Sequence, residues 1–401
     1  FGETEWQGDG TASIKIETGE TGYTLQYQRN GHEEGSWENI TSGEIISNLS
    51  HGDTVYARLY DGTNGSEHAS ASITDNTPPE VNISTSNLEF NSVTLNVTAS
   101  DGQSGLAESG TYKYYLGNNL QATNETNSYT FTGLTDGVQY TLKVAVTDKA
   151  GKTTEISTTI TTIEKTIENV LEEGNYVNYV DKTGTTRTCV VLYGPENTNY
   201  SNYGIQIITM ETVEDVELGN GTGVSEYNYD EGKLVIARDS YNNAISTLNA
   251  RTEAYLNTTY AVGARCVGTY PDNPSYDVGM YTNNDYSWFA NYNGTFKRSD
   301  ARYVDELEQM NTLGIQSINE RYWVASRRIR NDTDISALRF GIRTAEEDGT
   351  IENYVLCYFS ASNEGISTSY TFGLRPVFTL KSGIKITGGS GTSTSPYTLG
   401  V

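Results

Sequence analysis

Histidine is nearly absent from this chain and is confined to its beginning. The 401 residues include three histidines, His32, His51 and His68. A Ser-His-Asp or Cys-His arrangement and a histidine-ligated zinc site each need an imidazole beside the reacting or bound atom. The sequence after residue 68 therefore excludes these sites, and we expect that the protein is not an enzyme.

Cysteine is scarce too. Cys189, Cys266 and Cys357 lie far apart and none belongs to a Cys-x-x-Cys pair, so no zinc or redox motif is predicted. An odd number leaves at least one thiol free. Because all three have apolar or aromatic neighbours, we expect small core residues rather than nucleophiles.

Positive charge is in deficit, with 26 Lys and Arg against 51 Asp and Glu and a net charge of −25. Binding to nucleic acid or to anionic lipid needs clustered basic residues, so neither is an expected partner. No apolar run reaches about 18 residues, the length that spans a membrane. The chain begins at Phe1 without Met, so we expect that it was processed or trimmed, with any signal peptide or anchor upstream. These features indicate an extracellular protein at a cell surface.

Turn formers and tyrosine dominate the residues that are present. The chain has 40 Gly and 30 Tyr among many Thr, Ser and Asn, a composition that favours short strands and many turns. A weak internal repeat supports this interpretation, because Leu49-Ser-His-Gly52-Asp-Thr-Val-Tyr56 and Leu134-Thr-Asp-Gly137-Val-Gln-Tyr140 each predict a turn, a tyrosine and a strand. The tyrosine hydroxyl can bond back to the turn, as in the tyrosine corner of sandwich domains.

The first part of the chain predicts two β-sandwich domains, at 1–76 and 77–162. Alternating apolar and polar residues predict strands, and Pro78-Pro79 lacks backbone donors and marks a stiff linker. The segments 76–81, 101–106 and 148–151 resemble the fibronectin type III and bacterial Ig-like repeats of surface proteins. The resemblance implies a fold and leaves function open.

The sequence after residue 162 changes in composition. Residues 163–173 are rich in Glu and predict a linker helix. Helical spacing of apolar residues predicts helices over 240–256, with Asp239-Ser240 as N-cap, and over 299–313, with Gly314 after its end. Strands are predicted over 322–326, 338–343, 354–359 and 374–380. Helices followed by strands indicate an α+β head over 174–401.

Four segments of the head carry a second resemblance: 264–268, 321–327, 372–378 and 388–399. Together they resemble a family of Firmicutes surface proteins. The order Trp-x-x-Ser then Gly-x-Arg-Pro-Val is similar to the C-type lectin-like fold of formylglycine-generating enzymes and of variable proteins of diversity-generating retroelements. The predicted fold class is therefore multidomain, with two Ig-like or fibronectin III-like β-sandwiches before an α+β C-type lectin-like head.

The lectin-like resemblance implies a recognition surface before the last of these strands, here over 328–371. This segment is rich in Tyr, Ser and Asn, which also dominate antibody loops. A polar exterior with a few core tyrosines would have the same composition. The candidate ligand-binding residues are Arg328, Arg330, Asn331, Arg339, Arg343, Tyr354, Tyr358, Asn363 and Tyr370.

Other residues of the head are expected to be structural. Trp323 lies in an apolar strand and is predicted to be core, and Arg375 is predicted to pair with a carboxylate inside the head. The acidic residues Asp305, Glu306 and Glu308 share a helix and are predicted to form a solvated face.

No cofactor is expected, with one exception left open. Asp75 and Asp101 could hold a structural Ca²⁺ at the junction of the two Ig-like domains. Asx-turns explain the same residues without an ion. The tripeptides through which lectins bind sugar on calcium are absent.

These features predict a bacterial or phage surface protein that displays a lectin-like head on Ig-like stalk domains for recognition or adhesion. A subunit of a pilus-like filament and a phage receptor-binding protein are the alternatives. The expected partners are a host or bacterial surface protein or glycan, and copies of the chain itself if it assembles.

Overall fold

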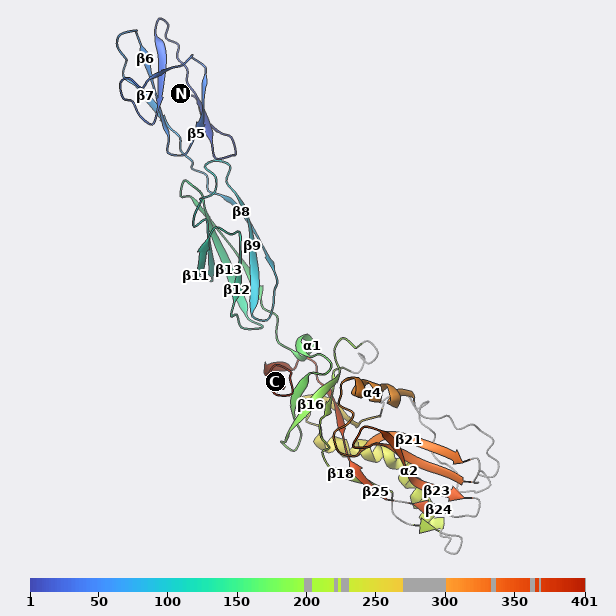
Figure 1. Ribbon diagram of the computed structural model, residues 1–401. Coiled ribbons are helices and arrows are strands. Elements are labelled where there is room, and N and C mark those ends of the chain that lie inside the picture. The colour runs from blue at the N-terminus through green and yellow to red at the C-terminus, as the bar shows by residue number, and fades with distance from the viewer. Residues whose placement is uncertain are drawn as a thin grey trace. The chain divides into compact units, whose positions relative to one another are not determined.

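The computed structural model describes residues 1–197, 204–219, 223–224, 231–269, 301–332, 337–360, 365–367 and 369–400. The chain divides into two compact units, residues 1–164 and 165–401 (Figure 1). Within the described ranges, no helix is both long and apolar enough to cross a membrane.

The first unit begins with a β-sandwich made of two antiparallel sheets, in the orders β1-β2-β5 and β4-β3-β6-β7. Its strands are β1 (Thr4–Trp6), β2 (Ala12–Lys15), β3 (Thr24–Arg29), β4 (Glu38–Asn39), β5 (Ile45–Leu49), β6 (Thr54–Tyr60) and β7 (Ala69–Ser72).

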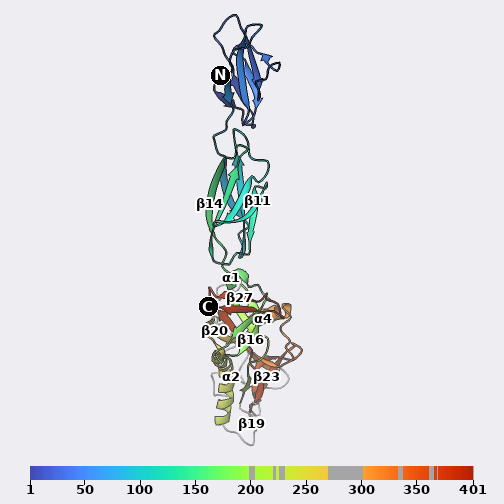
Figure 2. The ribbon, with the colours of Figure 1, turned by 90° about the vertical axis from the view of Figure 1, so that its left-hand side faces the viewer.

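A second sandwich repeats this arrangement, in the orders β12-β9-β8 and β11-β10-β13-β14. Figure 2 labels β11 and β14, the two edges of its four-stranded sheet. Facing antiparallel sheets of three and four strands are the architecture of Ig-like and fibronectin type III domains. Both sandwiches are therefore fibronectin type III-like, as the sequence predicts. The strands are β8 (Glu80–Ser86), β9 (Ser92–Ser100), β10 (Tyr112–Leu116), β11 (Asn119–Asn124), β12 (Ser128–Thr132), β13 (Gln139–Thr147) and β14 (Thr153–Thr161).

Each sandwich encloses a core of its own, built by alternation along the strands. In β9, Val93, Leu95 and Val97 are buried between partly exposed neighbours, and Leu142 and Val144 of β13 belong to the same core. Because side chains of a strand point to opposite faces in turn, a period of two is enough to build this core.

The predicted tyrosine corner forms in the second sandwich. The Tyr140 hydroxyl accepts a hydrogen bond from the Thr135 N–H at 2.9 Å, which confirms the prediction there. In the first sandwich the tyrosine follows its glycine by four residues instead of three, so Val55 takes the inward position and is fully buried. Tyr56 lies on the other face and packs against His32 and His68. The prediction for Tyr56 is wrong because a shift of one residue exchanges the faces of a strand.

The described part of the second unit contains two seven-stranded sheets, in the orders β20-β26-β17-β16-β15-β28-β27 and β18-β25-β21-β22-β23-β24-β19. The strands predicted over 322–326, 338–343, 354–359 and 374–380 correspond to β21, β22, β23 and β26. The strands are β15 (Tyr176–Val180), β16 (Thr186–Tyr193), β17 (Gln206–Thr209), β18 (Asp215–Leu218), β19 (Gly223–Val224), β20 (Ala261–Cys266), β21 (Tyr322–Asp332), β22 (Ala337–Ala345), β23 (Ile351–Ser360), β24 (Gly365–Ser367), β25 (Tyr370–Gly373), β26 (Pro376–Leu380), β27 (Lys385–Gly388) and β28 (Tyr397–Gly400).

Two helices pack on these sheets. Helix α2 (Glu231–Thr252) continues into a 3₁₀ turn, η2 (Glu253–Tyr255), and lies against β20 and β23. It begins earlier than the predicted 240–256, so Asp239 and Ser240 lie within the helix and do not cap it. Helix α4 (Ala301–Thr312) matches the helix predicted over 299–313, and Gly314 follows it with a φ of +68°, a conformation that favours glycine.

The helix predicted over 163–173 is a single turn, α1 (Ile167–Val170), which lies beside β27 (Figure 2). Its Ile167 N–H donates to the Ile384 oxygen at 2.9 Å, and Ile167 and Leu171 are buried in a core of the second unit. This segment is therefore part of the second unit and is not an independent linker helix.

Two large polar side chains of the head are fully buried. The Trp323 indole N–H donates to the Val216 oxygen at 2.8 Å, which confirms that Trp323 is core. Arg375 donates to the carbonyl oxygens of Thr209 and Ile315, both at 2.7 Å, and lies over the Tyr322 ring. The predicted carboxylate partner of Arg375 is therefore wrong, because carbonyl dipoles and an aromatic face hold this charge instead.

Candidate functional site

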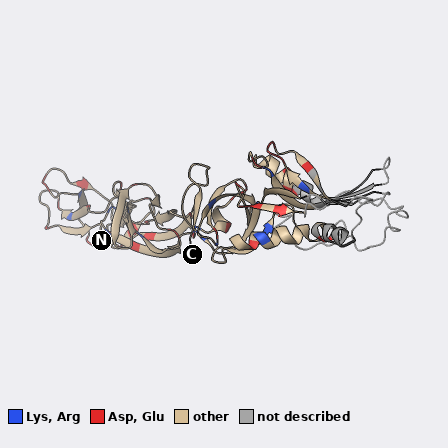
Figure 3. Cartoon of the chain, turned by 90° about the horizontal axis from the view of Figure 1, so that it is seen from below, with Lys and Arg blue, Asp and Glu red and all other residues tan. Residues whose placement is uncertain are grey.

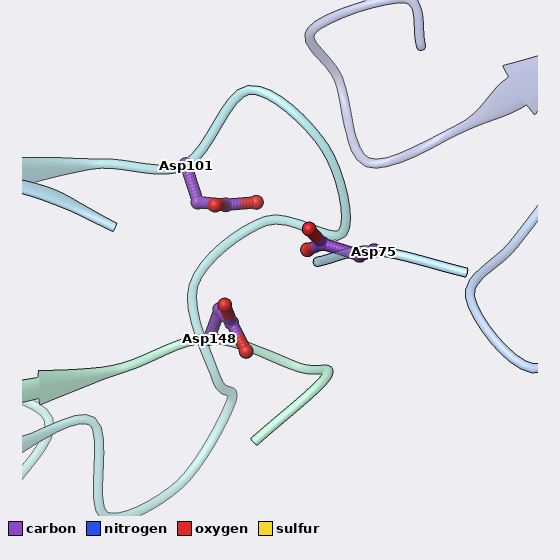
Figure 4. Close-up of side chains that lie close together, drawn as sticks. All are labelled: Asp75, Asp101 and Asp148. Atoms are coloured by element: carbon purple, nitrogen blue, oxygen red, sulfur yellow. The ribbon is translucent and has the colours of Figure 1, made fainter. Parts of the chain in front are cut away.

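Three aspartates of the first unit come together at the ends of separate segments. Asp75 follows β7 in the linker between the sandwiches, Asp101 directly follows β9, and Asp148 directly follows β13. One carboxylate oxygen of each lies within 4.8 Å of the others. Figure 4 shows the three side chains converging from their separate loops. Acidic residues occur in both units (Figure 3), so it is the distance between these three that sets them apart.

Hydrogen bonds from backbone and side-chain groups hold the carboxylates of Asp75 and Asp101. Asp75 accepts from the Thr77 N–H at 2.9 Å and, on its other oxygen, from the Ser104 N–H at 3.0 Å and the Ser104 hydroxyl at 2.5 Å. Asp101 accepts from the N–H groups of Gln103 and Gly105 at 3.0 and 2.8 Å. The Asx-turns anticipated at both positions are therefore present. Burial alone would raise the pKa of Asp75, but the bonds from Ser104 and Thr77 outweigh burial and hold that pKa below its ordinary value.

Asp148 is held differently. One of its oxygens accepts from the Lys152 N–H at 2.7 Å, while Oδ2 is buried and has no hydrogen-bond donor among the described residues. Burial raises the pKa of the Asp148 carboxyl, and the charges of Asp75 and Asp101 raise it further. At a separation near 4.8 Å, each pair of like charges repels by roughly 3 kcal/mol at an effective dielectric constant of about 20. The cluster thus concentrates negative charge.

Asp148 is the member of this cluster that sequence reasoning missed. It belongs to the turn Asp148-Lys-Ala-Gly151, which carries the resemblance to Ig-like repeats. Strands β9 and β13 belong to different sheets of the sandwich, and their last residues are directly followed by Asp101 and Asp148, so an acidic residue directly after each strand was the available signal.

The candidate binding residues of the head fall on neighbouring strands of one sheet. Arg328, Arg330 and Asn331 belong to β21, Arg339 and Arg343 to β22, Tyr354 and Tyr358 to β23, and Tyr370 to β25. The order β25-β21-β22-β23 makes these strands adjacent, and Arg330, Arg339 and Tyr358 are paired in register. Asn363 lies outside the described residues.

Two tyrosines of this group join an aromatic cluster. The Tyr354 ring lies 4.7 Å from the rings of both Tyr370 and Phe372, and Phe372 lies 4.8 Å from Trp323. Both tyrosines are half-buried against the core. Such rings keep one polar edge at the surface while the other part packs, so they combine core and surface roles.

Arg343 must be removed from the predicted binding face. It is 4% exposed and donates to the Ser326 hydroxyl at 2.6 Å. A side chain enclosed in this way has no surface to offer a large partner, so its place in the head is structural.

Glu306 corrects the predicted solvated acidic face of α4. It is fully buried and accepts two hydrogen bonds from Arg265, at 3.0 and 2.9 Å, and one from the Gly268 N–H at 3.0 Å. Glu308 is exposed, as predicted, and the side chain of Asp305 lies outside the described residues. Glu306 therefore belongs to a buried ion pair in the core and not to a solvated face.

The described cysteines are buried. Burial raises the pKa of the Cys266 thiol to about 12, and burial likewise raises the pKa of Cys189. Because the thiolate is the reactive form, both fit the predicted role of small core residues. The side chain of Cys357, on β23, lies outside the described residues.

Comparison with solved structures finds a fold likeness for part of the chain. A two-domain fibronectin type III segment from chicken tenascin covers 40% of this chain and 98% of its own length, with 18% sequence identity and a TM-score of 0.27. No protein-family model matches the chain, and neither does any curated protein. A likeness of this degree carries no conclusion about function.

Proposed function

We propose that the chain is an extracellular recognition or adhesion protein whose two sandwiches form a stalk and whose second unit is a lectin-like binding head. The register of three candidate residues carries this proposal, because Arg330, Arg339 and Tyr358 are paired across the adjacent strands β21, β22 and β23 and so lie on the same face of the sheet. A sheet fixes the backbone beneath a surface, so contacts made from it start from an ordered geometry.

The lectin-like assignment is supported by the neighbourhood of its two motifs. Trp323-Val-Ala-Ser326 lies on β21 and Gly373 ends β25, and these strands pair in parallel at Tyr322 and Gly373. Two helices, α2 and α4, accompany the sheets, as such a head requires.

Binding without catalysis is supported by the state of the ionisable groups. The head has no histidine, Glu306 is paired with Arg265, and Cys189 and Cys266 are buried thiols. We therefore place recognition ahead of turnover as the activity of this unit.

The test is binding of the full chain to glycan and surface-protein arrays, with and without the double change Arg330→Ala and Arg339→Ala and the single change Tyr358→Ala. We expect a defined set of targets and a loss of about tenfold or more in affinity for each variant. Arg251→Ala is the matched control, because Arg251 is exposed on α2 and paired with Glu214.

Silence of the parent chain across broad arrays would contradict recognition, as would equal losses in the control. Ordered polymers in micrographs of the full chain would favour the filament alternative. Turnover of any bound glycan would contradict binding without catalysis.

A further inference from the structure

We propose that Asp75, Asp101 and Asp148 form a Ca²⁺ site that ties the linker after β7 to the second sandwich. Their carboxylates reach one another from three separate segments and lie within 4.8 Å (Figure 4). A buried oxygen of Asp148 without a hydrogen-bond donor distinguishes this cluster from other groups of acidic residues.

Asp148 supplies the independent observation. The residue is 2% exposed, and its Oδ2 has no hydrogen-bond donor in the part of the chain that the structure describes. The other oxygen is committed to the Lys152 N–H, so the side chain is anchored while Oδ2 is left over. A buried anionic oxygen without a partner is costly, and a bound cation removes that cost.

Beside the cluster, the His51 ring accepts a hydrogen bond from the Asp75 N–H at 3.0 Å, and no Lys or Arg of the described residues balances the three carboxylates. Among the described residues, none of the three aspartates forms an ion pair with Lys or Arg, and the nearby Lys149 pairs with Glu108.

The donor set favours calcium over other cations. The three ligands offered are carboxylate oxygens, which suit hard cations, whereas zinc and copper prefer sites with imidazole or thiolate. All three oxygens come from loops and not from a rigid octahedral frame. Ca²⁺ accepts such irregular sets and completes its shell with carbonyl oxygens and water, while Mg²⁺ demands near-ideal geometry.

Because Asp75 lies in the linker between the two sandwiches, a bound ion would affect the stiffness of that linker. Asp75 follows Ile73, a core residue of the first sandwich, and its carboxylate already accepts hydrogen bonds from Ser104 of the second sandwich. An ion shared with Asp101 and Asp148 would add a charged bond between the linker and the second sandwich and stiffen the linker.

The test uses the full chain, calorimetric titration with CaCl₂ after treatment with chelator, and thermal unfolding with and without Ca²⁺. We expect one saturable site and a rise of about 5–10 °C in the unfolding temperature of the first unit at a Ca²⁺ concentration about 100-fold above Kd. Asp148→Asn keeps the shape and the bond from Lys152 but should abolish both effects.

The Asp148→Asn variant also distinguishes a loss of Ca²⁺ binding from a loss of fold stability that does not involve the ion. In chelator, Asp148→Asn should unfold at or above the temperature of the parent, because one of three crowded charges is gone. In Ca²⁺ it should unfold below the parent. Asp101→Asn, at a partly exposed position, repeats the test where the fold is at less risk.

Asp61→Asn is the matched control, because Asp61 follows β6 as Asp148 follows β13 and accepts two backbone hydrogen bonds of 2.7 Å. Its Ca²⁺ titration should equal that of the parent. The proposal is overturned by an unchanged Ca²⁺ response in Asp148→Asn and Asp101→Asn, by the absence of a saturable site in the parent, or by equal binding of Mg²⁺.

Discussion

The buried carboxylates of the second unit and the three-aspartate cluster of the first unit are held in opposite ways. In the second unit, Glu306 meets Arg265 and Asp181 meets Arg187, so each acid has a guanidinium beside it. In the first unit, Asp53 likewise meets Arg29, but Asp75, Asp101 and Asp148 meet one another and neutral donors. A protein-supplied counterion makes a charge part of the core, whereas an acid cluster without one depends on the composition of the solvent.

The largest change in stability should come from removing one partner of the buried Glu306–Arg265 ion pair in the second unit. Glu306→Gln leaves Arg265 buried with its charge unbalanced, and we expect a loss of about 3–5 kcal/mol in the free energy of unfolding of that unit. Scanning calorimetry of the full chain, following the transition of the second unit, measures this. Glu308→Gln on the exposed side of α4 is the control and should change stability by less than about 0.5 kcal/mol. Equal stability of the Glu306 variant and the parent would contradict the distinction between the units.

A smaller effect is expected at Asp181. This fully buried carboxylate accepts from the Thr183 hydroxyl at 2.5 Å, the Thr183 and Thr185 N–H groups, and Arg187 at 2.9 Å. Burial would raise its pKa, but these hydrogen bonds and Arg187 outweigh burial and lower the pKa below its ordinary value. We expect Asp181→Asn to cost about 2 kcal/mol at neutral pH.

The pH dependence of that cost follows from the direction of the shift. A lowered pKa in the folded state stabilises the protein above the unfolded pKa of about 3.9, and the contribution is lost as the pH falls through the folded value. The difference between parent and Asp181→Asn should therefore be full at neutral pH and shrink below about pH 4 in urea titrations. Asp348 makes the same bonds to a threonine two residues on, and these lower the pKa of its exposed carboxyl, so Asp348→Asn measures the share of the hydrogen bonds without the contribution of Arg187. A difference in the free energy of unfolding between parent and Asp181→Asn that stays constant down to acid pH would contradict the lowered pKa of Asp181.

The smallest effect should come from the neutral donors of the first unit. Ser104→Ala removes the hydroxyl bond to Asp75 but leaves the Ser104 N–H in place, so we expect a cost of about 1 kcal/mol to the first unit in chelator. Thermal unfolding beside Ser70→Ala, an exposed change on β7, measures it. A loss in stability as large as that of Glu306→Gln would contradict this expectation, because neutral donors would then stabilise a buried carboxylate as much as a guanidinium does.

How far the sequence predicts this molecule depends on whether the deciding partner is near in the chain. The strands of both sandwiches follow from alternation, and the Tyr140 corner follows from a local spacing that the structure confirms. Tyr56 fails because its spacing from Gly52 is longer by one residue, a difference visible in the sequence.

For Glu306, helical periodicity could predict burial but not the partner of the buried side chain. It lies four residues before Met310 and next to Leu307, so it shares the buried face of α4. That placement was available from the sequence. Its partner Arg265 lies on β20, however, and no local sequence pattern predicts a contact between residues so far apart in the chain.

Asp148 and Arg375 depend on topology in the same way. Asp148 joins Asp75 and Asp101 because the strand order brings loop ends together, and Arg375 finds carbonyl oxygens of two distant segments. The sequence analysis named Asp75 and Asp101 together and did not name Asp148 as the third member of the cluster.

The position of Arg375 and β26 late in the chain bears on how the protein is made. Strand β26 pairs with both β17 and β20, and Arg375 reaches Thr209 and Ile315, so β20 is not joined to the rest of its sheet until residue 380 has emerged. The first unit pairs its strands within each sandwich and can fold while the remainder is still being synthesised or exported. Chains cut short by premature termination would therefore carry finished sandwiches and an open second unit, which is the form that proteases and chaperones would meet.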